Sequence, residues 1–243
     1  MFLTEFTIYE VIIIFVIVTV GSVLQGCLGF GLGPIAVPLL VMIDPVFIPG
    51  PLLLVAIFLV SLIYMRERHA ADTRDILWAV IGRTTGTILG AILLLAVPKD
   101  RLSLLFGIMV LVALIFFSSG FKLPVNRTNL ISAGILSGFM GIASSIGGAP
   151  MALLYKDKEG PKLRGTLSGI FIIGTLIALI TLIIINRFGM PELKASVLLI
   201  PGIILGFFLS KYATKYLDRG FIRPAILIVS AGCAALLIIK HFT

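Results

Sequence analysis

Hydrophobic residues occur in long runs along this chain, and short polar stretches separate one run from the next. Runs close to the length of a membrane-spanning helix lie at 7–28, 51–65, 76–97, 102–120, 166–186, 195–213 and 221–240. A shorter run, 30–43, and a longer one, 128–155, each carry a cluster of glycines with a proline. The pattern predicts an all-helical protein that crosses a membrane several times.

The composition agrees with this class and weakens other interpretations. Hydrophobic residues make up 59% of the chain and charged residues 12%, far from a soluble globular domain. A net charge of +8 would suggest nucleic acid as the partner of a soluble protein, but loop charges set the orientation of a membrane protein. We therefore expect the lipid bilayer, and no nucleic acid, as a partner. The first run has no basic segment before it and no small-residue cleavage site after it, so we expect a retained span.

Two halves of the chain resemble each other. Residues of the same type recur 116 positions apart at Gly31 and Gly147, Pro34 and Pro150, Ala36 and Ala152, Gly86 and Gly202, and Gly90 and Gly206. We expect two repeats, residues 1–121 and 122–243. Each would hold a glycine-broken hairpin, 7–43 or 128–155, followed by three spans.

Loop charges predict how the repeats are oriented. Most of the 19 lysines and arginines fall in the loops 66–75, 120–129, 156–164 and 211–223, which the positive-inside rule places in the cytoplasm. A hairpin enters and leaves the membrane on the same side, and the three spans that follow cross it three times. The second repeat would therefore start on the opposite side and be inverted relative to the first. Inverted repeats with broken helices that meet near the midplane are a transporter architecture. A single crossing by 128–155, which its length also permits, would remove the inversion.

The glycine clusters "GFGLG" (29–33) and "SSIGG" (144–148) interrupt apolar helices. A helix that starts at membrane depth presents unpaired N–H groups and the positive end of its dipole, which favour an anion. Candidate ligands of that anion are Gly29, Gly31 and Gly33 in the first cluster and Ser144, Ser145, Gly147 and Gly148 in the second. The alternative is that glycines serve only close helix packing. We expect that role for Gly82, Gly86, Gly90, Gly134, Gly138, Gly202 and Gly206, which are spaced by four.

Arg83 is the ionisable residue placed deepest in an apolar run. A charge inside the membrane is costly and by default marks a functional site. The alternative is that its side chain extends to the headgroups. An anionic substrate would balance the guanidinium, and Gln25, Thr84 and Thr85 would add neutral hydrogen-bond donors.

Other function classes fit the chain less well. The two histidines, His69 and His241, lie in a loop and at the C-terminus, so no base is placed beside a membrane-buried nucleophile and we expect no enzyme. Cys27 and Cys233 lie far apart in apolar runs, which predicts neither a disulfide nor a metal site; we expect no cofactor. A cation transporter would ordinarily carry an intramembrane carboxylate. An anion channel and a non-transporting accessory subunit stay open as alternatives.

The motifs "GFGLGPIAVPLL" (29–40), "GIASSIGGAPMALLY" (141–155) and "KLRGTLSG" (162–169) resemble those of the TauE/SafE family of sulfite-exporter-like permeases. The resemblance covers essentially the whole chain. It implies a duplicated inner-membrane carrier for sulfite, thiosulfate, sulfoacetate or other organosulfur anions. Many members have glycine where Leu32 stands and proline where Ala149 stands, so the resemblance implies a differently shaped pocket.

Overall fold

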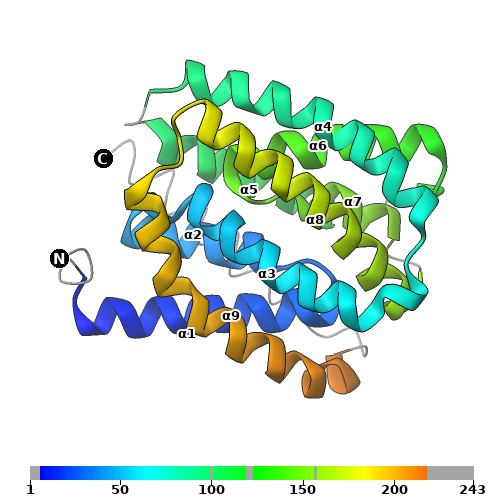
Figure 1. Cartoon of the computed structure of the whole chain (residues 1–243), viewed down its shortest axis with the longest axis horizontal. Coiled ribbons are helices and arrows are strands. Elements are labelled where there is room, and N and C mark those ends of the chain that lie inside the picture. The colour runs from blue at the N-terminus through cyan, green and yellow to red at the C-terminus, as the bar shows by residue number, and fades with distance from the viewer. Residues whose placement is uncertain (1–5, 99–100, 119–122, 156–157, 218–243) are drawn as a thin grey trace.

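The computed structural model describes residues 6–98, 101–118, 123–155 and 158–217, and this part of the chain is all-helical (Figure 1). The helices are α1 (Ile8–Leu28), α2 (Leu32–Ile43), α3 (Gly50–Glu67), α4 (Thr73–Ala96), α5 (Leu102–Ser118), α6 (Arg127–Ser144), α7 (Gly148–Tyr155), α8 (Gly160–Ile184) and α9 (Met190–Leu217). Within the described ranges, α1, α3, α4, α8 and α9 are long and apolar enough to cross a membrane. The chain is therefore a multi-pass membrane protein. The span expected at 221–240, Cys233 and His241 lie outside the described residues.

Both predicted hairpins are interrupted at their glycine clusters. Helix α1 ends at Leu28 and α2 begins at Leu32, while α6 ends at Ser144 and α7 begins at Gly148. The residues that end α1 and α6 are Gly29 and Ser145, both left-handed, with φ of 77° and 63°; such a residue terminates a helix because it turns the chain away from the helix axis. The stretch 128–155 therefore forms two helices and not one continuous helix.

The helices that follow the breaks are too short to span a membrane. Helix α2 has 12 residues and α7 has 8, or roughly 18 and 12 Å at 1.5 Å per residue, against a hydrocarbon core of about 30 Å. They begin side by side: a Cβ built on Gly33 would lie 2.5 Å from the Ser145 carbonyl oxygen, and one on Gly148 would lie 3.1 Å from Phe30 Cβ. From this junction α2 and α7 run toward opposite ends of the bundle (Figure 1).

The most extensive helix pairs are α4 with α6 and α1 with α9. Their backbones touch at glycines: a Cβ on Gly86 would overlap the Ile135 carbonyl, and one on Gly206 would lie 2.7 Å from the Thr19 carbonyl oxygen. A Cβ would likewise lie close to a carbonyl of the facing helix if it were added at Gly82, Gly90, Gly134, Gly138 or Gly202. The packing role predicted for these seven glycines is confirmed.

Helix α8 begins earlier than the apolar run 166–186 indicates. Its first turns contain Lys162 and Arg164, which the charge pattern assigned to a loop. These side chains pair with Asp72 and Glu67, each at 3.0 Å. Because carboxylates on other segments compensate both charges, the helix extends into a stretch that reads as polar loop.

Candidate functional site

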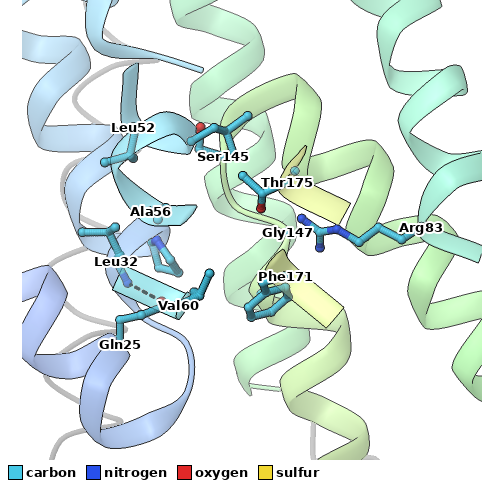
Figure 2. A pocket seen from close by; sticks show the side chains of 16 residues that line it. Gln25, Leu32, Leu52, Ala56, Val60, Arg83, Ser145, Gly147, Phe171 and Thr175 are labelled. Carbon is cyan, nitrogen blue, oxygen red and sulfur yellow. Dashed lines mark hydrogen bonds between the residues drawn. The ribbon is translucent and has the colours of Figure 1, made fainter. Parts of the chain in front are cut away.

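A cavity lies where the two breaks meet. Its volume is about 50 Å³, counted as space open to the centres of water molecules. One water needs roughly 10–15 Å³ by that measure, so the cavity has room for a few waters or a small ion. Residues of α1, α2 and α3 form one wall, and residues of α4, α6, α7 and α8 form the other (Figure 2).

Arg83 enters the cavity from α4. Its residue surface is 3% exposed, and its Nη1 donates a hydrogen bond to Ser137 Oγ. Ser137 Oγ donates in turn to the Gly147 carbonyl at 2.6 Å. The guanidinium carbon lies 5.0 Å from the centre of the Phe171 ring, and Nε is buried without a hydrogen-bond partner. The side chain points into the protein (Figure 2) and not toward the headgroups.

Three glycines leave room for this side chain. A Cβ on Gly174 of α8 would overlap the Arg83 stem, and Cβ atoms on Gly141 and Gly147 would each lie 3.1 Å from a guanidinium nitrogen. Any larger residue at Gly174 would displace the arginine. The guanidinium position is therefore determined by α6, α8 and the second break together.

No ion pair that the structure describes involves Arg83. The pairs are Arg66–Glu67, Arg164–Glu67 and Lys162–Asp72, and all of these residues lie near the end of α3 or the beginnings of α4 and α8. A buried cation without a compensating charge is unfavourable in a low-dielectric interior. The site is therefore electrostatically suited to an anion.

The remaining polar groups of the cavity differ in their availability. Gln25 Oε1 accepts a hydrogen bond from the Leu32 N–H at 3.2 Å (Figure 2), so it satisfies the first donor of α2. Ser145 Oγ donates to the Pro49 carbonyl at 2.9 Å. The Thr175 hydroxyl makes no hydrogen bond with the described residues and lines the cavity. Opposite Arg83, the wall contributed by α3 is apolar, with Leu52, Leu53, Ala56 and Val60.

The structure places seven of the predicted ligands around this cavity and four elsewhere. Those that line it are Gln25, Gly31, Gly33, Arg83, Ser145, Gly147 and Gly148. Outside the lining, Gly29 packs against Leu163 and Arg164 of α8. The hydroxyls of Thr84, Thr85 and Ser144 each donate to a carbonyl one turn earlier in their own helix, at 2.9, 3.3 and 2.9 Å. Such bonds satisfy a hydroxyl inside an apolar helix without a ligand.

Sequence reasoning missed Ser137, Gly174, Phe171 and Thr175. Ser137 stands in a stripe of packing glycines, and Gly174 stands in an apolar run, so neither is conspicuous. Phe171 and Thr175 are four residues apart and share a helix face. A threonine on one face of an apolar helix was the sequence signal that could have identified them. The apolar residues of α3 give no sequence signal of a role at the site.

Comparison with known proteins gives one family. No curated protein and no solved structure matches the chain. The family model described as sulfite exporter TauE/SafE matches residues 13–237, which include both breaks, the cavity residues and all the helices from α2 to α9. The chain belongs to the sulfite exporter TauE/SafE family.

Proposed function

We propose that this protein transports small sulfur-containing anions across the cell inner membrane. Sulfite, thiosulfate and an organosulfonate such as sulfoacetate are the candidate substrates. One observation carries the proposal: the buried guanidinium of Arg83 reaches a cavity between two half-helix starts without an ion-pair partner among the described residues. The family description supports sulfur oxyanions as the substrate class.

The cavity residues have different roles in the proposed binding of the anion. A guanidinium can direct two N–H groups at two oxygens of a sulfur oxyanion. Ser137 positions that guanidinium, since it bonds both Arg83 and the Gly147 carbonyl. The Thr175 hydroxyl and the N–H groups that begin α7 supply further donors. The apolar wall of α3 excludes water, which strengthens each of these bonds.

We also propose that residues 1–121 and 122–243 are inverted repeats. Helices α1 and α6 end 116 positions apart, and α2 and α7 begin 116 positions apart. Exchanging α1–α4 for α6–α9 turns the α1–α9 pair into α6–α4 and the α3–α9 pair into α8–α4, and all four pairs are packed. This correspondence supports a two-fold relation between the repeats. Alternating access around the cavity would follow from such an architecture.

An anion channel is the second candidate. The ion pairs of the described residues favour it, because none of them joins a carboxylate to Arg83. A carrier coupled to protons would need such a titratable group beside the site. Saturable exchange of anion in proteoliposomes would favour a carrier, and non-saturating flux would favour a channel.

The test is a binding screen of purified protein against sulfite, thiosulfate, sulfoacetate, taurine and chloride. We expect at least one sulfur oxyanion to raise the thermal stability of the wild-type protein more than chloride does. The same anion should have a much smaller effect on Arg83→Gln. If no anion binds, the protein is better explained as an accessory membrane subunit.

A further inference from the structure

Two groups of described helices are each tied together by their own contacts. We call α1, α2, α3 and α9 the α1 half, and α4, α6, α7 and α8 the α4 half. In the α1 half, the backbones of α1 and α9 touch at glycines. Arg66 of α3 donates to the Gly26 carbonyl at 2.6 Å and to Ser210 Oγ of α9 at 3.3 Å.

The α4 half is connected in the same way. Helices α4 and α6 pack backbone to backbone. Asp72, which caps α4, pairs with Lys162 of α8 at 3.0 Å, and this hydrogen bond lowers the pKa of the Asp72 carboxyl. Tyr155 of α7 donates to Asp75 of α4 at 2.7 Å. Each half therefore combines helices from both sequence repeats.

The cavity lies between these halves. Gln25, the start of α2 and the apolar face of α3 belong to the α1 half, whereas Arg83, Gly147, Phe171 and Thr175 belong to the α4 half (Figure 2). A motion of one half against the other would open the cavity. These two halves differ from the segments 1–121 and 122–243, because each half contains helices of both segments.

Arg164 connects the halves on the face that carries the loop 66–75. It is 5% exposed and donates to Glu67 Oε1 at 3.0 Å and to the Cys27 carbonyl at 3.1 Å. Beside it α8 presses onto the end of α3, because a Cβ on Gly165 would lie 2.7 Å from the Glu67 carbonyl oxygen. At another place, Ser145 joins the halves by its neutral bond to Pro49.

We propose that Arg164 is the latch that closes the cavity on the loop 66–75 face; this rests on the transport function proposed above. Glu67 Oε1 also accepts a bond from Arg66 Nε at 3.0 Å, within the same half. When the halves part, Glu67 keeps Arg66 as its partner and Arg164 is left as an unpaired cation on the face that carries the loop 66–75. An exposed guanidinium there attracts the anion toward the site.

The test is cysteine accessibility in membrane vesicles of known orientation. Cys27 and Cys233 are changed to alanine, Ala56→Cys reports on the cavity, and a separate His69→Cys protein identifies the face that carries the loop. An impermeant maleimide is applied to each face of vesicles that contain the reporter with Arg164, Arg164→Gln or Arg164→Lys. Lys162→Gln is the matched control, since it removes an ion pair of the same helix that lies within one half.

We expect Arg164→Gln to speed labelling from the His69 face by about tenfold or more, because a lost charged hydrogen bond shifts the closed–open equilibrium by that order. Arg164→Lys should give a smaller increase, and Lys162→Gln none. An unchanged rate for Arg164→Gln, an equal increase for Lys162→Gln, or an equal increase from both faces would overturn the proposal. Labelling needs no anion, so a failed binding screen would reject the substrate class without deciding about the latch.

Discussion

Replacement of Arg83 is the sharpest test of the anion site, because its charge and its geometry can be changed separately. Arg83→Gln removes the charge, and Arg83→Lys keeps the charge but removes the planar fork. The three N–H groups of lysine diverge from a single nitrogen, so lysine cannot present the parallel pair of N–H groups that a guanidinium directs at two oxygens of one oxyanion. We expect Arg83→Lys to bind the best anion of the screen clearly more weakly than the wild type, and Arg83→Gln to bind it more weakly still.

The expected magnitude follows from burial. Arg83 is 3% exposed and lies against the Phe171 ring, so the paired charges would be almost fully desolvated. Truncating one partner of such a pair costs roughly 2–5 kcal/mol, which is a loss of about 30-fold to several thousand-fold in affinity. In the absence of anion, Arg83→Gln should leave the thermal stability unchanged or raise it, because a buried cation that lacks a counter-ion is itself unfavourable. The thermal stability of anion-free Arg83→Gln should therefore not fall below that of the wild type.

Calorimetric titration and thermal unfolding with the same anion measure both effects. Arg127→Lys is the matched control, since Arg127 is exposed, stacks on Trp78 with 3.8 Å between the guanidinium carbon and the ring centre, and lies outside the cavity lining. It should bind the anion like the wild type. An Arg83→Lys protein that binds the anion as tightly as the wild type, or a folded Arg83→Gln protein that keeps its affinity, would exclude Arg83 as the anion ligand.

Three other changes test the support of Arg83, the glycine packing and the orientation of the repeats. Ser137→Ala should weaken the anion by about tenfold, since it frees Arg83, while Ser137→Thr should restore part of the affinity in the same titration. Gly86→Ala should destabilise the protein by about 1–3 kcal/mol through the overlap with the Ile135 carbonyl, yet the protein that stays folded should bind anion normally; a specific loss of binding would contradict a pure packing role. Cysteines at Pro45 and Lys158 should be labelled by an impermeant reagent from opposite faces of the membrane, and labelling from one face would contradict the inverted repeats.

The positions of most described helices and of both breaks could be predicted from local pattern. Gly29 and Ser145 end their helices where the glycine clusters stand, because the backbone freedom of such residues is a local property. The isolated charge of Arg83 in an apolar run was equally visible. The start of α8 could not be predicted from the local pattern. Lys162 and Arg164 are accommodated in a helix because they pair with Asp72 and Glu67, which lie about 90 residues earlier in the chain.

The composition of the site depended on tertiary structure. Thr84 and Thr85 adjoin Arg83 in sequence, but the helix turns them away and their hydroxyls bond their own backbone. Ser137 and Gly174, which hold and admit the guanidinium, come from helices that pack beside α4 only after folding. Hydrophobic periodicity determines which face of a helix is buried, but not which face of another helix it meets or at what height. The sequence alone therefore determined the broken helices and the presence of a charge in an apolar run, and only the packing of α4, α6 and α8 buried that charge and decided which side chains surround it.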